Sequence, residues 1–129
     1  MSAASNFLEL KILDHALGTA SYTAPSNVYV GLFTSDPTDE GTGTEVSGNG
    51  YARQEATFSA AASGSASTDA TITFDPANGG NWGTITHIGI YDADSAGNLL
   101  WHGSVTASKV IEDGDTFQIS TGSLTISLD

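Results

Sequence analysis

The sequence contains no cysteine and very few basic side chains. The absence of cysteine excludes disulfide bonds and cysteine-ligated zinc sites, so packing or contacts with other chains must stabilise the folded state. Three basic residues, Lys11, Arg53 and Lys109, stand against fifteen acidic ones, and the formal net charge is −12. Three cations cannot build a basic patch, and phosphate groups would be repelled. We therefore expect no direct binding to nucleic acid and no docking on anionic membranes.

Long apolar runs are also missing from the sequence. The N-terminal stretch "MSAASNFLELKILDHALG" has no basic start, and Glu9 and Asp14 interrupt its apolar residues. It is typical of neither a signal peptide nor a membrane span. We expect no membrane insertion and a product that is made in the cytoplasm and used or assembled there.

The length of 129 residues predicts a single domain over residues 1–129. A chain of this length can bury roughly two-thirds of the surface that its unfolded form exposes. A hydrophobic core is therefore possible without disulfide or metal cross-links.

One α-helix is predicted near the N-terminus, over about residues 7–17. Asn6 can cap it, Glu9 can complete a capping box, and Gly18 supplies a left-handed stop. A wide apolar stripe runs along it, formed by Phe7, Leu8, Leu10, Ile12, Leu13, Ala16 and Leu17. Two interpretations remain open: the stripe covers an open face of a sheet, or it packs on a neighbouring subunit.

The rest of the chain alternates between strand and turn patterns. Apolar or alternating segments occupy residues 27–33, 51–58, 70–74, 84–92, 99–105, 116–120 and 123–128. About eight short strands of this kind predict an all-β fold, an antiparallel β-sandwich of jelly-roll type with one N-terminal α-helix. Two long polar loops, 35–50 and 59–69, are unusual in so small a domain, and we expect a partner to order them.

The stretch "WGTITHIGIYDADSAGN" (82–98) raises the question of catalysis. His87 lies in a predicted strand, and His15 and His102 are the other histidines. A nucleophilic serine on a "GxSxG" turn is absent, so no catalytic triad is predicted. His87 and His102 are better interpreted as half-buried strand residues, possible neighbours across the hairpin.

The same stretch contains a partial resemblance to a calcium loop, because Asp92, Asp94 and Gly97 follow one another at suitable spacing. Ala96 stands where an oxygen ligand belongs, and Gly103 replaces the glutamate at the twelfth position. A hairpin tip with Asx turns is the simpler interpretation. Three histidines on separate elements also disfavour zinc. We predict no metal site and no cofactor.

Packing is the interpretation that we adopt for this segment. Strict alternation places Trp82, Thr84, Thr86, Ile88 and Ile90 on one face of the strand, and Ile85, His87, Gly89 and Tyr91 on the other. Both faces carry apolar bulk, and glycines within strands often mark a close approach by another segment. The predicted interface residues are Phe7, Leu10, Leu13, Leu17, Gly31, Gly89, Tyr91, Trp101 and Gly103.

Four stretches in matching order carry a resemblance to a known family. They are Ser5–His15, Val28–Arg53 with "VYVGLFTSDPTDEGTGTEVSGNGYAR", Trp82–His102 with "WGTITHIGIYDA" and "GNLLWHG", and Gly114–Asp129 with "GDTFQISTGSLTISLD". Together they cover about two-thirds of the chain. The sequence resembles a family of small virion structural proteins of tailed bacteriophages, whose members are commonly labelled tail fibre proteins.

The resemblance implies a structural role in a phage particle and no catalytic residues, so we do not expect an enzyme. Fibres usually have shafts built from repeats or heptads, and this chain has neither. Our leading hypothesis is therefore a capsid decoration (cement) protein on the particle exterior, assembled in the host cytoplasm. It would form a homo-oligomer, with a trimer expected, and contact a major capsid or tail protein.

Two further functions remain as alternatives. A receptor-binding tail-fibre module would stack host surface glycans on aromatic rings, with Trp82, Trp101, Tyr51 and Tyr91 as candidates. A hydrolase acting on polysaccharide would use a pair of carboxylates, but no acidic residue lies in a context that would clearly raise a carboxyl pKa.

Overall fold

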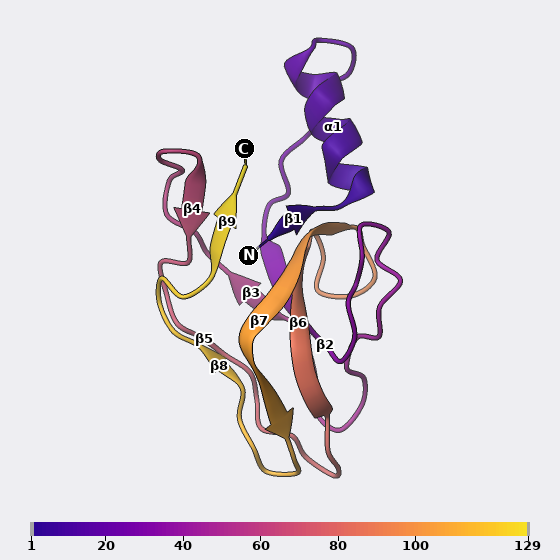
Figure 1. The fold of residues 1–129 in the computed structure, drawn as a ribbon, viewed down its shortest axis with the longest axis vertical. Coiled ribbons are helices and arrows are strands. Elements are labelled where there is room, and N and C mark those ends of the chain that lie inside the picture. The colour runs from indigo at the N-terminus through magenta and orange to yellow at the C-terminus, as the bar shows by residue number, and fades with distance from the viewer. Residues whose placement is uncertain (1, 129) are drawn as a thin grey trace.

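The computed structural model describes residues 2–128 and confirms an all-β fold with one N-terminal helix (Figure 1). The elements are β1 (Ala3–Ala4), α1 (Asn6–Ala16), β2 (Val28–Phe33), β3 (Gln54–Ala56), β4 (Ser65–Ser67), β5 (Ile72–Thr73), β6 (Gly83–Tyr91), β7 (Leu99–Ile111), β8 (Gln118–Ile119) and β9 (Thr125–Ser127). All strand pairs are antiparallel.

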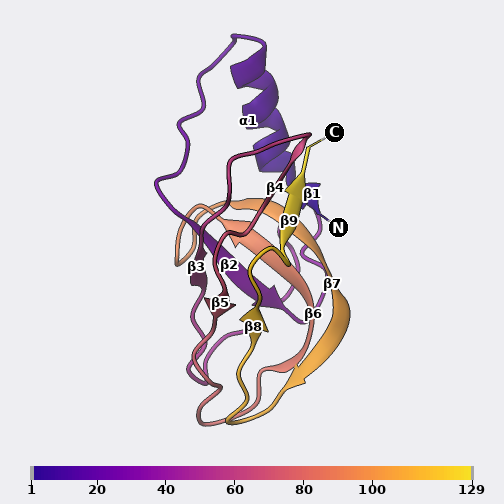
Figure 2. The same ribbon diagram turned by 90° about the vertical axis from the view of Figure 1, so that its left-hand side faces the viewer.

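The strands form two layers around one main core. A five-stranded sheet has the order β1-β7-β6-β2-β3, and the two-stranded sheets β4-β9 and β5-β8 lie across from it (Figure 2). Val30 and Leu32 of β2 are fully buried and face Phe74 and Leu124 of the opposite layer within the core. Burial of these side chains removes apolar surface from water and is the main source of folding free energy.

The pairing of β6 with β7 contains an irregularity that changes which residues share a face. Ile85 pairs with Lys109, but His87 pairs with Ser104, so the register shifts between them. As a result Ile85 and Ile88 both point into the main core. The prediction that Ile85 shares a face with His87 is wrong, because a bulge breaks the period of two on which strict alternation depends.

Strand β7 runs to Ile111, well beyond the predicted end at residue 105. Strand β4 lies within the segment 59–69, for which the sequence predicts a polar loop, and its Ser65 pairs with Ser127 of β9. Backbone hydrogen bonds to a neighbouring strand stabilise this Ser/Ala segment, which has no apolar pattern of its own.

The long segment 35–50 is ordered by its own chain, which corrects the expectation that a partner orders it. The amide of Thr34 donates to the Thr44 carbonyl, and that of Val46 donates to the Leu32 carbonyl. Pro37 is fully buried. The segment therefore folds back along β2 and supplies the cover that the outer face of the sheet requires.

Candidate interaction surface

Helix α1 is attached at one end of the sandwich through Ser5. The Ser5 hydroxyl accepts a hydrogen bond from the Leu8 amide (3.2 Å) and donates to the Leu99 carbonyl (2.5 Å). The Ser5 amide also donates to the Leu100 carbonyl (2.8 Å). One buried residue therefore caps the helix and joins it to β7.

The prediction that Asn6 caps the helix is wrong, because Asn6 is its first residue and is exposed. The cap lies one residue earlier, where tertiary contacts bury a hydroxyl between the helix and β7. A capping box needs Glu or Gln as the third residue after the cap. With Ser5 as the cap that residue is Leu8, so the box predicted with Glu9 does not form. The predicted stop is confirmed: Gly18 has φ of 78° directly after the capping residue Leu17.

Most of α1 projects away from the sandwich (Figure 1). Leu8 is its only buried residue among those described, and the helix contacts β1 and β7 at its first turns. Of the two interpretations of its apolar stripe, cover for an open sheet face is wrong, because segment 35–50 already occupies the outer face. Packing on a neighbouring subunit stays a prediction.

The predicted interface residues Leu10, Leu13 and Leu17 remain exposed, with 64%, 55% and 75% of their surface accessible. The spacing i, i+3, i+7 places them in one narrow row along the helix. Phe7 differs from them, because it is half-buried and packs edge-to-face on Tyr22 with ring centroids 6.4 Å apart. The row of exposed leucines thus begins one turn above the body of the protein.

Three other predicted interface residues are covered by their own chain. A Cβ at Gly31 would lie 2.7 Å from Glu45 Oε2, and one at Gly89 would lie 2.8 Å from Leu99 Cδ1. Tyr91 is buried and stacks on Phe33. The close approach predicted from these strand glycines is real, but side chains of the same molecule make it, which corrects the expectation of a second chain there.

The cover of this outer face centres on a partly buried ion pair, Arg53–Glu45, that the sequence pattern does not predict. Arg53 donates two hydrogen bonds of 2.8 Å to the Glu45 carboxylate and further bonds to the carbonyls of Ala93 (3.0 Å) and Ala96 (2.7 Å). Its guanidinium lies 3.5 Å above the Tyr91 ring. The available signal was the rarity of arginine in so acidic a chain.

The ion pair changes the protonation behaviour of its neighbours. Burial, followed by the hydrogen bond that its hydroxyl donates to Glu45, raises the pKa of Tyr51 far above its ordinary range. Burial and then the Glu45 charge raise the pKa of Tyr91. Burial alone would lower the pKa of Arg53, but the hydrogen bonds and charge of Glu45 outweigh it and raise that pKa. Tyr51, Tyr91 and Arg53 therefore keep their protons at neutral pH, and their contacts with Glu45 act as a structural clamp.

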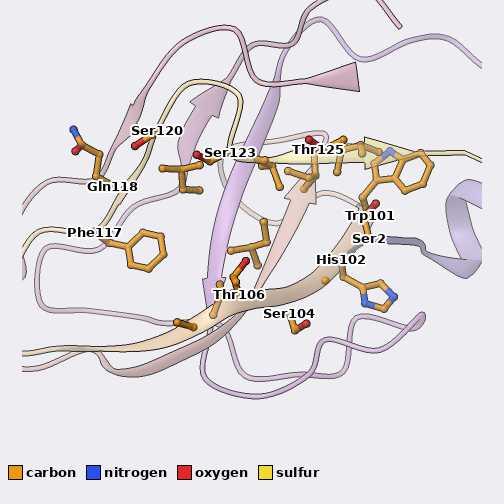
Figure 3. A pocket seen from close by; sticks show the side chains of 18 residues that line it. Ser2, Trp101, His102, Ser104, Thr106, Phe117, Gln118, Ser120, Ser123 and Thr125 are labelled. Carbon is orange, nitrogen blue, oxygen red and sulfur yellow. The ribbon is translucent and has the colours of Figure 1, made fainter. Parts of the chain in front are cut away.

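Trp101 and Gly103, the remaining predicted interface residues, lie along a groove between β7 and the strands β8 and β9 (Figure 3). Of the four aromatic residues named as glycan candidates, Trp82 is buried and its indole donates to the Asn49 carbonyl (3.0 Å). Tyr51 packs against Trp82 inside the core, and Tyr91 lies under Arg53. Trp101 lines the groove beside β7, and Tyr91 also lines a shallower hollow at the base of α1.

The histidines and Asp92 make local structural contacts. His102 Nε2 lies 2.7 Å from Asp39 Oδ1, and His87 Nδ1 lies 2.8 Å from the Thr86 hydroxyl. Asp92 accepts from the amide (2.7 Å) and the side chain (2.9 Å) of Asn98 six residues later, which closes the hairpin loop across its base. Within residues 2–128 no three histidine, aspartate or glutamate side chains gather as metal ligands would.

No helix in the described part of the chain has the length and apolar composition needed to cross a membrane.

Comparison with protein families gives one match. The model described as "Podophage GP4 fiber I protein gp80" matches residues 3–127, nearly the whole chain. None of the curated proteins compared with the chain matches it.

Proposed function

We propose a function from the premise that the chain belongs to the family of the podophage GP4 fiber I protein gp80 and is therefore a virion structural protein. It is a non-enzymatic module on the particle exterior that assembles with copies of itself through α1. The observation that carries this proposal is the row Leu10, Leu13 and Leu17, exposed on a helix that projects from the sandwich.

Physical reasoning supports self-association through this row. A helix of 11 residues is marginal in water without a packed apolar face. Burying one leucine side chain contributes about 1.5–3 kcal/mol, so covering the row stabilises both the helix and the assembly. Because each chain carries a net charge of −12, copies repel one another over most of their surface. An uncharged leucine row is where they can approach, and we expect three helices packed around a shared axis.

The test compares the wild-type protein with Leu10→Gln/Leu13→Gln by light scattering after size exclusion. The wild type is expected to be a trimer and the double variant a monomer. Lys11→Gln is the matched control, since Lys11 is exposed on the same helix but lies on the side away from the leucine row. A wild-type protein that stays monomeric at high concentration contradicts the proposal.

The family description favours a place in a fibre, with a tail protein as the neighbour. Capsid decoration is a second candidate, favoured by the compact sandwich and by the lack of a shaft or repeated heptads within residues 2–128. Labelling the protein on intact particles and imaging them separates the two: label on the shell assigns decoration, and label at the fibres assigns the tail.

The absence of catalysis is also a proposal. In its support, the partly buried charged side chains Glu45 and Arg53 are held by each other as structural partners. Incubation with host capsule or peptidoglycan, followed by an assay for new reducing ends, tests it. Release of reducing ends above a heat-denatured control would show an enzyme.

A further inference from the structure

Two Asn–Gly pairs lie next to each other at the end of the sandwich opposite α1. Asn49–Gly50 ends segment 35–50, and Asn78–Gly79 lies in the segment that leads from β5 to β6 (Figure 1). The Asn78 amide donates to the Asn49 carbonyl (2.9 Å), and all four residues are exposed. Because glycine has no Cβ, its backbone nitrogen is open to approach by the side-chain amide of the asparagine before it. Both pairs therefore have the residues for succinimide formation, and the structure treats them differently.

The first pair is held on both sides of its peptide bond. Asn49 Nδ2 donates to the Asn81 carbonyl (3.1 Å). The Asn49 carbonyl accepts from the Trp82 indole (3.0 Å) as well as from the Asn78 amide. Attack by the Gly50 nitrogen on the Asn49 side chain requires the side chain and the peptide group to rotate, and these hydrogen bonds oppose both rotations.

The second pair is free where the first is held. Among the hydrogen bonds of residues 2–128, none involves the side chain or the carbonyl of Asn78. The Gly79 amide donates to Asp113 Oδ1, and the distance of 3.0 Å between nitrogen and oxygen is within reach for proton transfer. A carboxylate therefore lies against the nitrogen that would act as the nucleophile, beside an asparagine side chain that can turn toward it.

We infer that Asn78–Gly79 is a self-modification site, at which Asp113 serves as the internal base for deamidation. The Gly79 nitrogen forms a bond to Asn78 Cγ and gives its proton to the Asp113 carboxylate. The bond between Cγ and Nδ2 breaks, and the side-chain nitrogen takes up that proton and leaves as ammonia. Water then opens the cyclic imide at either carbonyl, which leaves aspartate or isoaspartate at position 78. The step needs no reagent other than water.

The product alters a junction between two loops. The Ala77 amide donates to the Asp115 carbonyl (3.0 Å), and the Gly114 amide donates to the Ala77 carbonyl (2.7 Å). Deamidation places a new negative charge beside Asp113 in a chain whose net charge is already −12, and isoaspartate also lengthens the main chain. Modified protein is therefore expected to loosen at this end of the sandwich, while α1 at the other end keeps its contacts.

The test follows the wild-type protein during prolonged incubation at neutral pH and physiological temperature. Peptide mapping by mass spectrometry measures the conversion of amide to acid at each asparagine and separates aspartate from isoaspartate. Conversion at Asn78 is expected to be at least about tenfold faster than at Asn49, because Asn78 alone has an internal base. In protein unfolded with urea the two pairs are expected to react at similar rates, since the contacts that distinguish them are lost.

Asp113→Ser tests the base, because it removes the carboxylate but keeps a side-chain oxygen. Serine is used because asparagine at this position would create a third Asn–Gly pair. The rate at Asn78 is expected to fall about tenfold in this variant, with circular dichroism confirming the fold. Glu112→Gln is the matched control, since Glu112 is exposed next to Asp113 and its loss removes the same charge. This control is expected to leave the rate unchanged.

The sign of the change in Asp113→Ser separates a base from a tether. A carboxylate that only holds the loop would protect Asn78, so its removal would speed the reaction. An unchanged or faster rate in Asp113→Ser overturns the assignment of the base. Equal rates at Asn49 and Asn78 in the folded wild type, or no conversion at Asn78, overturn the proposed site.

Discussion

The guanidinium of Arg53 holds the carboxylate of Glu45 through two hydrogen bonds of 2.8 Å, with 9% and 22% of the two side chains exposed. A paired charge in this setting contributes both attraction and geometry, and removing one partner leaves the other charge buried and unpaired. Glu45 lies within segment 35–50, and Arg53 directly precedes β3. The pair therefore ties the covering segment to the start of β3. It stabilises the covered face of the sheet, whereas the leucine row of α1 stays exposed.

Replacement of Arg53 is expected to be strongly destabilising. Arg53→Met leaves Glu45 with only the Tyr51 hydroxyl and deprives the carbonyls of Ala93 and Ala96 of their donor. The expected loss in the free energy of unfolding is about 1.5–3 kcal/mol, measured by urea denaturation. Lys109→Met is the control, because it removes the same charge from an exposed position on β7 and is expected to cost less than about 0.5 kcal/mol. Equal losses in the two variants would contradict a structural role for the ion pair.

Tyr51 is expected to make the free energy of unfolding vary with pH in the alkaline range. Its pKa is raised in the folded state by burial and then by Glu45, from an unfolded value of 10.0. Above about pH 10 the unfolded chain loses this proton while the folded chain keeps it, so stability falls as the pH rises. In Tyr51→Phe the free energy of unfolding is expected to fall less steeply between pH 9 and 11. At pH 7 the variant is expected to lose about 1–3 kcal/mol of stability, because the Leu32 amide loses its acceptor. Urea denaturation at several pH values checks both effects, and an unchanged slope would rule out Tyr51 as their source.

Gly89 is expected to tolerate no added methyl group. A Cβ there would lie 2.8 Å from Leu99 Cδ1 and 3.0 Å from Phe33 Cε1, inside the packed outer face. Gly89→Ala is expected to reduce the free energy of unfolding by about 1–3 kcal/mol, which is seen as a lower thermal midpoint. Thr84→Ala, exposed on the same strand, is expected to change stability by no more than about 0.5 kcal/mol. A Gly89→Ala protein as stable as wild type would show that this face is loosely packed.

Ser5 and Asn6 distinguish the observed helix cap from the one that the sequence pattern predicts. Ser5→Ala removes the acceptor for the Leu8 amide and the donor to the Leu99 carbonyl, at an expected cost of about 1–2 kcal/mol. Asn6→Ala is expected to have little effect, because Asn6 is exposed within the first turn. Hydrogen exchange of the α1 amides reports on the cap directly, and faster exchange in Asn6→Ala than in Ser5→Ala would reverse the assignment.

Several features of the site could be predicted because they depend on local chemistry. The alignment of Leu10, Leu13 and Leu17 in one row follows from their spacing, and the Gly18 stop follows from the backbone freedom of glycine. Features that depend on distant residues could not be predicted. The Arg53–Glu45 pair brings together two strongly polar side chains through the path of a loop, and the bulge near Ile85 reverses a face without any change in residue pattern.

Composition and periodicity by themselves determined that this chain is an acidic, cysteine-free, mostly β protein with one amphipathic helix at its start, because these properties depend on residue types and short spacings. Only the tertiary structure decided which surfaces remain open. The segment 35–50 folds over one face of the sheet, α1 projects from an end, and a groove stays open between β7 and the strands β8 and β9. The physical reason is that exposure depends on how segments far apart in the chain compete to cover the same apolar surface, and that competition is settled only when the whole chain packs.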